Sequence, residues 1–232
     1  MASAAPAPTR TETDSLGSME IPADAYWGIH TARADANFPI TKRPISVYPD
    51  LVVALAMVKQ ASARANREIG VLDPERADLI DRAAQRVIDG EFHDQFTVGV
   101  IQGGAGTSTN MNANEVITNI ALELAGREKG DYAFLSPIDH TNRSQSTNDV
   151  YPTAVKIGLS LTLRSLLEEL DLLRISFLHK SHEFHDVLKV GRTQLQDAVP
   201  MTLGQEFHGF ASTLGYDHTR LTENASLMFE IN

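Results

Sequence analysis

The chain has 232 residues, of which 42% are hydrophobic and 22% are charged, as is ordinary for a globular protein with a sizeable core. Its formal net charge of −10 disfavours a surface that neutralises phosphates, so nucleic acid is not an expected partner. The sequence contains no cysteine, which excludes disulfides, thiolate metal ligands and a cysteine nucleophile and fits a reducing compartment.

The first residues are expected to carry neither a membrane anchor nor a secretory signal. No apolar run in the chain approaches the ~20 residues that span a bilayer, so no membrane partner is expected. Residues 1–18 contain alanines and prolines but no basic segment followed by an apolar one. We predict a disordered tail over residues 1–18 and a cytoplasmic location.

The middle of the chain is predicted to be helical. Residues 21–40 contain prolines in an irregular pattern and are interpreted as loops and short turns. A helix is expected from Asp50, acting as its cap, to Gly70. A second helix is expected to start at Asp73-Pro74-Glu75, because a cap, a first-position proline and an acid near the positive helix end coincide there. Gly90 ends it.

The next helix is predicted from a capping-box spacing between Asn112 and Glu115, and it ends at Gly126. Residues 91–109 are expected to form a short helix followed by a loop. Pro152 is expected to open a long helix that reaches about His185.

A last helix is predicted from Thr202 to Asn232, after a loop over residues 189–200. Four of its apolar residues recur every seven positions, which is typical of a helix packed in a bundle: Phe207, Leu214, Leu221 and Met228. Because this apolar seam continues almost to Asn232, we expect missing sequence or partner chains. No strand-like alternation is evident, so the predicted fold class is all-α.

Three polar clusters share one composition of short hydroxyls and amides: Gly106 to Asn110, Ser144 to Asp149, and Gly191 to Gln194. The first two precede predicted helix starts, where free backbone N–H groups and the helix dipole favour an anion. The pattern therefore indicates a small carboxylate held by neutral donors, with ordinary helix capping as the alternative. The first loop lacks the lysine of a P-loop, so nucleotide binding is rejected.

Four of the eight histidines are candidates for a special role, and each is given an ordinary interpretation. His179, His182 and His185 would cover an arc of ~120° on a helix without an HExxH spacing, which favours a solvated face over a zinc site. His140 is expected to be a buried, hydrogen-bonded histidine.

The polar clusters lie within four longer motifs: IPADAYWGIHTARADANFPI, QGGAGTSTNMNANEV, DHTNRSQSTNDVYPT and GRTQLQDAVPMTLGQEF. With these motifs in this order, residues 19–232 resemble the aspartase/fumarase superfamily and, within it, the aspartate ammonia-lyases. Fumarases typically have SSND where this chain has Ser146-Thr147-Asn148-Asp149, and GRTH where it has GRTQ. Some aspartases carry that histidine too, so the glutamine discriminates less than the threonine.

The resemblance implies a fold, a reaction and a site. It implies an all-α chain with an N-terminal lyase domain over 19–147 and the first part of a long-helix central bundle over 148–232. The implied reaction converts L-aspartate to fumarate and ammonia without an organic or redox cofactor. A divalent metal activates some members of the superfamily, and nothing in this sequence identifies its site. The residues implied to line the substrate site are Thr107, Ser146, Thr147, Asn148 and Thr193, with Gln194 at its edge.

The resemblance also locates the catalytic base outside this sequence. In the superfamily the base is a serine in a glycine-rich loop with the sequence GSSxMPxKxNP, and these 232 residues contain no copy of it. Members of the superfamily build each site from three subunits of a homotetramer, and the resemblance implies the same assembly here. We therefore expect an N-terminal part that is inactive alone. Two alternatives remain open: a fumarate hydratase, and a truncated non-catalytic subunit that assembles with longer partners.

Overall fold

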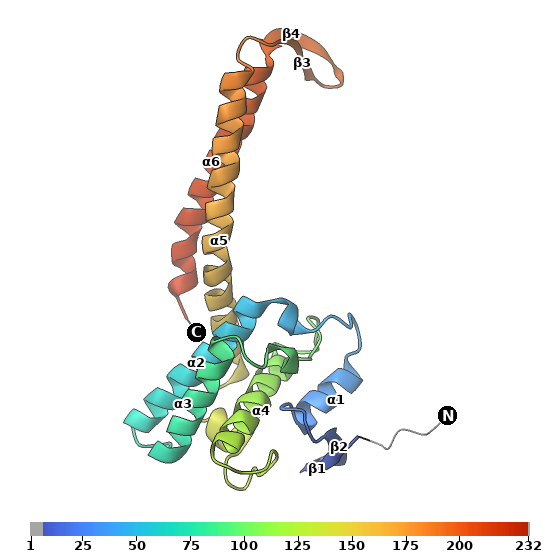
Figure 1. Cartoon of the computed structure of the whole chain (residues 1–232), viewed down its shortest axis with the longest axis vertical. Coiled ribbons are helices and arrows are strands. Elements are labelled where there is room, and N and C mark those ends of the chain that lie inside the picture. The colour runs from blue at the N-terminus through green and yellow to red at the C-terminus, as the bar shows by residue number, and fades with distance from the viewer. Residues whose placement is uncertain (1–6, 232) are drawn as a thin grey trace, which may run out of the picture. The chain divides into compact units, whose positions relative to one another are not determined.

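The structure is a computed structural model that describes residues 7–231 (Figure 1). It divides into two compact units. The first contains the chain up to Leu159 together with Ile231, and the second contains residues 160–230. Within the described residues, no helix combines the length and the apolar character that crossing a bilayer requires.

The described part of the chain begins with a β-hairpin, in a region where a disordered tail was predicted. Strand β1, Thr9–Asp14, pairs antiparallel with β2, Gly17–Pro22. The guanidinium of Arg10 fixes this hairpin by donating to the carbonyls of Ala25 and Trp27, each at 2.7 Å. The prediction is wrong for residues 9–18, because polar side-chain bonds rather than an apolar alternation hold the hairpin. Residues 1–6 of the predicted tail lie outside the described residues.

Four helices build the core of the first unit: α1, Ile29–Asn37; α2, Pro49–Glu68; α3, Pro74–Ile88; and α4, Thr107–Leu124. Helix α4 is the most deeply buried of them, and α1, α2 and α3 all pack against it (Figure 1). Its fully buried apolar side chains include Val116, Ile117, Ile120 and Leu122. A helix that is buried nearly all round positions any polar side chain it carries very firmly.

The sequence predicted most helix ends correctly. Asp73 caps α3 by accepting a hydrogen bond from the backbone N–H of Arg76 at 3.0 Å. Gly70, Gly90 and Gly126 all have positive φ and follow the ends of α2, α3 and α4. Asp50, in contrast, lies in the first turn of α2 and is not its cap.

Two helix starts were predicted too late. Helix α4 begins at Thr107 rather than near Asn112, because Gly106 takes a left-handed conformation that turns the chain into the helix. Helix α5, Thr147–Glu183, begins before Pro152, which lies inside it. The segment 21–40 was predicted as loops and turns but contains α1. This helix is held mainly by polar contacts, so its sequence shows no helical period of apolar residues.

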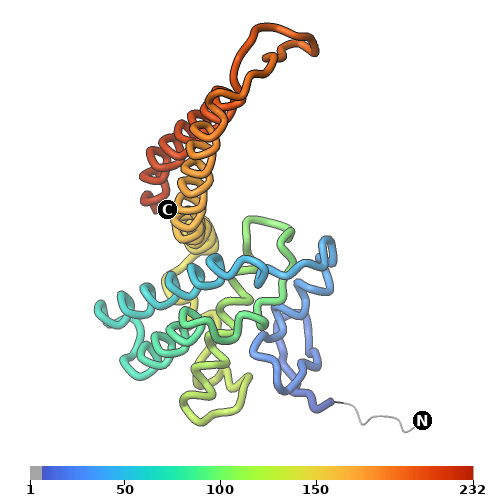
Figure 2. The backbone as a smooth tube through the Cα atoms, turned by 45° about the horizontal axis from the view of Figure 1, so that its top comes forward, coloured from blue at the N-terminus to red at the C-terminus, as the bar shows by residue number. Residues whose placement is uncertain are grey.

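Short turns of helix complete the first unit: 3₁₀ turns at Ile45–Val47 and His93–Gln95, and a π-helical turn at Pro137–Thr141. Figure 2 follows the backbone through these connections. The 3₁₀ turn at His93–Gln95 falls where a short helix was expected within residues 91–109. The π-helical turn precedes the second polar cluster directly.

The second unit pairs α5 beyond Leu159 with α6, Leu203–Ala225. The ring of Phe177 lies 5.8 Å from that of Phe207, a residue of the predicted apolar seam, and 5.7 Å from that of Phe210. Thr202 and Gln205 form a capping box at the start of α6. The helix ends at Ala225, earlier than predicted, and a 3₁₀ turn follows at Ser226–Phe229.

The loop predicted over 189–200 is instead a hairpin of β3, Leu188–Thr193, and β4, Gln196–Thr202. The described strands form two separate two-stranded sheets, which the sequence pattern did not predict. These hairpins are small beside the helices, and the predicted all-α class is correct.

Candidate substrate-binding site

The first polar cluster forms the start of α4. A Cβ atom at Gly106 would lie 2.3 Å from Cγ of Tyr151, so the loop packs directly against the early turns of α5. Thr107 is the first residue of α4 and is exposed. No side chain of the described residues caps this helix, and its first-turn N–H groups therefore point toward any anion bound there.

The second polar cluster forms the start of α5. The hydroxyl of Ser146 accepts a hydrogen bond from the backbone N–H of Asn148 at 3.2 Å. Ser146 and Asn148 are exposed, whereas Thr147 is half-buried. The amide nitrogen of Asn110 donates to the hydroxyl of Thr147 at 3.3 Å, which joins this cluster to the first turn of α4. The structure thus brings the first two predicted clusters together.

A buried lysine that the sequence analysis did not single out lies beneath both clusters. The ammonium of Lys59, on α2, donates to Oδ1 of Asn110 at 2.6 Å, to Oε1 of Gln145 at 2.9 Å and to Oδ1 of Asn142 at 3.0 Å. Lys59 is fully buried, and this desolvation lowers its pKa to about 7. Its position held a signal, since Lys59 falls on the same helical face as the apolar residues Val52, Leu55, Ala56 and Ala63.

The third polar cluster belongs to the second unit. Thr193 ends β3 and Gln194 begins the turn to β4, and both are exposed. Gln194 and Leu195 have φ values of 48° and 61°, as a two-residue hairpin turn requires. That Thr193 and Gln194 join the first two clusters stays a prediction.

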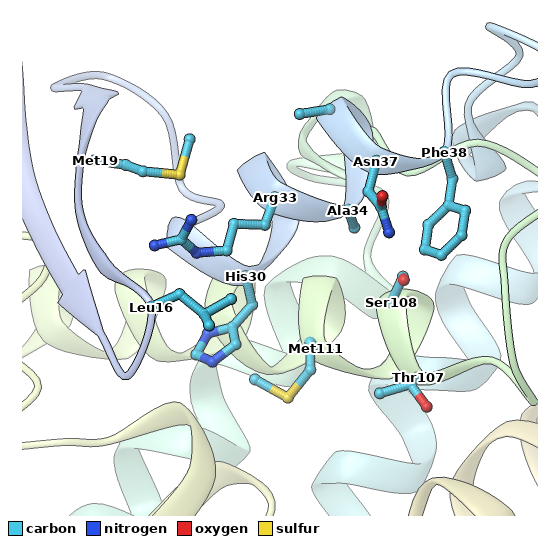
Figure 3. A pocket seen from close by; sticks show the side chains of 11 residues that line it. Leu16, Met19, His30, Arg33, Ala34, Asn37, Phe38, Thr107, Ser108 and Met111 are labelled. Carbon is cyan, nitrogen blue, oxygen red and sulfur yellow. The ribbon is translucent and has the colours of Figure 1, made fainter.

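Thr107 also lines a pocket of about 610 Å³ in the first unit (Figure 3). Ser108, Phe38 and Met111 line it beside Thr107. The guanidinium of Arg33, which faces the same pocket, is held by the carboxylate of Asp14 at 2.7 and 2.8 Å. This pocket is therefore lined mainly by apolar atoms, and the guanidinium of Arg33 already has a carboxylate partner.

The histidine at the π-helical turn has the structural role predicted for it. Nδ1 of His140 accepts a hydrogen bond from the backbone N–H of Ser136 at 2.8 Å. The side chain is half-buried rather than buried, and desolvation lowers its pKa. Across residues 7–231, no three histidine, aspartate or glutamate side chains converge in a way that could hold a metal ion.

Comparison with known proteins matches most of the chain to one family. A family model described as lyase matches residues 17–230. The aspartate ammonia-lyase of Pseudomonas aeruginosa is 59% identical over 97% of this chain and 48% of its own length. That of Escherichia coli is 50% identical over 96% of this chain and 47% of its own length. The chain thus spans about half the length of these curated relatives.

Solved structures share the fold. A Brucella melitensis protein described as fumarate lyase:delta crystallin has a TM-score of 0.93 and 53% identity, covering 97% of this chain and 52% of that one. A class II fumarase from Schistosoma mansoni has a TM-score of 0.85 and 34% identity, covering 97% of this chain and 47% of that one. With the helical core, the two joined polar clusters and these matches, the chain belongs to the lyase family of the aspartase/fumarase superfamily.

Proposed function

We propose that this chain is the N-terminal part of an aspartate ammonia-lyase, which eliminates ammonia reversibly from L-aspartate to give fumarate. One observation carries the proposal. Over 97% of the chain, identity is 59% to the Pseudomonas aeruginosa aspartate ammonia-lyase but 34% to the Schistosoma mansoni class II fumarase. Ser146-Thr147-Asn148-Asp149, in place of the SSND of fumarases, supports the same choice.

The proposed reaction is an elimination through a carbanion. A base removes a proton from the carbon next to the side-chain carboxylate, and the electron pair of that C–H bond moves into the carboxylate as a dianionic aci-form. The pair then forms the C=C bond of fumarate while the C–N bond breaks and ammonia leaves. The serine base would come from the GSSxMPxKxNP segment of the superfamily, which these 232 residues do not contain.

The residues of this chain would hold the carboxylate on which charge develops. The hydroxyls of Thr107, Ser146 and Thr147 are suitable donors, and the uncapped first turn of α4 adds backbone N–H groups. Asn148, Thr193 and Gln194 would complete the site in the assembled enzyme. Donors aimed at growing negative charge lower the barrier, and losing one typically reduces turnover ~10²–10³-fold.

The working enzyme in this proposal is a cytoplasmic homotetramer that needs no organic or redox cofactor. Large apolar side chains of the second unit support assembly, since Leu172 is 59% exposed and Phe210 48% exposed. We expect the 232-residue chain alone to be inactive and to associate through these side chains.

The test is turnover of L-aspartate and L-malate by the complete protein that carries this chain, followed by the ultraviolet absorbance of fumarate. We expect a strong preference for L-aspartate. A preference for L-malate would replace the proposal with a fumarate hydratase. If neither substrate reacts and the chain co-purifies with a longer homologue, it is a non-catalytic subunit.

A further inference from the structure

We propose that Lys59 is a positioning residue for the substrate-carboxylate site and that it acts through Asn110 on the hydroxyl of Thr147. The inference rests on the proposed function, because it concerns the same site. The three polar clusters of the site offer mostly neutral donors. The inference adds a positive charge to the site, that of the buried Lys59 on α2.

The geometry forms a continuous hydrogen-bonded chain. The ammonium of Lys59 donates to Oδ1 of Asn110 at 2.6 Å, and Nδ2 of the same amide donates to Oγ1 of Thr147 at 3.3 Å. Because Thr147 accepts this bond with its oxygen, its own hydrogen is left to donate to a bound carboxylate. Each link polarises the next, so the ammonium strengthens the final donor.

The same ammonium fixes the loop that precedes α5. It donates to Oδ1 of Asn142 at 3.0 Å and to Oε1 of Gln145 at 2.9 Å. Asn142 in turn accepts from Nδ2 of Asn114 at 3.2 Å and donates to the carbonyl of Gln145 at 3.1 Å. One cation therefore sets the position of the second polar cluster relative to α4.

The charge of Lys59 suits the chemistry. All three hydrogen-bond partners of its ammonium are neutral amides, with no carboxylate of the described residues among them. A charge in a buried environment is screened less than one in water. When protonated, the Lys59 ammonium would favour the dianionic aci-carboxylate over the singly charged ground state, and such selective stabilisation lowers the barrier.

Packing alone gives little reason for a lysine here. Lys59 is fully buried, and burying a cation without a counter-charge destabilises a protein. A methionine of similar length would fill the space without that desolvation. The amide oxygens of Asn110, Asn142 and Gln145 instead form a cradle that holds an ammonium.

The test compares two variants with a matched control in the complete enzyme. Lys59→Met removes the ammonium donor from all three amide oxygens, of which Oδ1 of Asn142 still accepts from Nδ2 of Asn114. Asn110→Asp keeps an acceptor for Lys59 but removes the Nδ2 donor to Thr147. Gln60→Met is the control, because neighbouring Gln60 is buried on α2 and donates instead to the Asp81 carbonyl and the Gln85 side chain of α3.

We expect kcat for L-aspartate, per folded active site, to fall at least ~10-fold in Lys59→Met and Asn110→Asp, with a smaller change in KM and near-normal kcat in Gln60→Met. Equal losses in all three variants would mean a merely structural role and would overturn the inference. Wild-type kcat in Asn110→Asp would overturn it even if Lys59→Met fails to fold. If the wild-type enzyme does not turn over L-aspartate, both the proposed function and this inference are wrong. If the wild type is active and Lys59→Met and Asn110→Asp have the same kcat as the wild type, only this inference is wrong.

Discussion

The carboxylate of Glu115, in the middle of α4, accepts a hydrogen bond from the hydroxyl of Thr31 in α1 at 2.6 Å. The same carboxylate accepts from the backbone N–H groups of Gly28, His30 and Thr31 at 2.9, 2.8 and 3.1 Å. The carboxylate of Glu12, on β1, accepts a hydrogen bond from the backbone N–H of Ile29 at 2.8 Å. Two acids from distant segments thus close the positive end of α1 and hold it against α4.

Replacing Glu115 by glutamine is expected to destabilise the fold strongly. Glu115 is fully buried, and the amide NH₂ of glutamine would face backbone donors that need an acceptor. We expect the free energy of unfolding to fall by about 3 kcal/mol, measured by chemical denaturation. Glu128→Gln, at an exposed position, is the control and should change stability little. Equal stability of the two variants would contradict the anchoring role of Glu115.

The contact between His30 and Glu115 should make stability depend on pH. Nδ1 of His30 lies 3.0 Å from the Glu115 carboxylate, and this hydrogen bond raises the pKa of His30 above 6.5. The stabilisation is therefore complete below pH 6.5 and is lost as the pH rises through the folded-state pKa. We expect the stability difference between wild type and His30→Asn to shrink over that range in denaturation experiments. A constant difference would argue against the interaction.

Burial of Lys59 should produce the opposite trend. Its pKa is lowered from 10.5 to about 7 by desolvation, so the unfolded state binds more protons between these two values. Stability relative to Lys59→Met should rise as the pH increases from 7 to 10.5. Nuclear magnetic resonance of the labelled Lys59 side chain should show a titration midpoint far below the ordinary lysine pKa of 10.5. A midpoint near 10.5 would show that the cradle fully compensates burial.

Alanine at Gly106 should destabilise the protein more than alanine at Gly126. Both glycines have positive φ, at 89° and 69°, but only at Gly106 would the new Cβ meet a ring, that of Tyr151. Gly126→Ala should therefore lower the free energy of unfolding by about 1–2 kcal/mol, through left-handed backbone strain alone. Gly106→Ala should lower it by clearly more. Thermal or chemical unfolding measures both variants. Equal losses would mean that Tyr151 moves aside freely.

Removing the hydroxyl of Thr147 should reduce catalysis without unfolding the complete enzyme. Thr147→Ala is expected to lower kcat for L-aspartate by ~10²–10³-fold, because a donor to the developing charge is lost. Thr147→Ser keeps the hydroxyl and should retain most of the activity. Steady-state kinetics of both variants test this role. Near-normal turnover in Thr147→Ala would remove Thr147 from the substrate site.

The sequence predicted those elements whose signals are local. Asp73 and Pro74 start α3 as expected, and Gly70 and Gly90 follow the helix ends where they were placed. Helix α6 starts at the predicted place, directly after its cap Thr202, although the hairpin just before it was predicted to be a loop. A cap or a terminating glycine acts through its own backbone neighbours, and these are readable in order along the chain.

The elements that the sequence did not predict depend on distant partners. The β1–β2 hairpin is fixed by Arg10 bonding to carbonyls of Ala25 and Trp27, and α1 by acids from β1 and α4. Neither feature leaves an apolar period, so hydrophobic patterning could not reveal them.

The amino-acid sequence by itself determined the helical class, most helix ends and the composition of the polar clusters, since each follows from short-range backbone chemistry and periodicity. Only the tertiary structure decided that Asn110 links two of those clusters and that Lys59 lies beneath them. Residues 59, 110 and 147 lie far apart along the chain, and their hydrogen bonds exist only after α2, α4 and α5 have packed and excluded water.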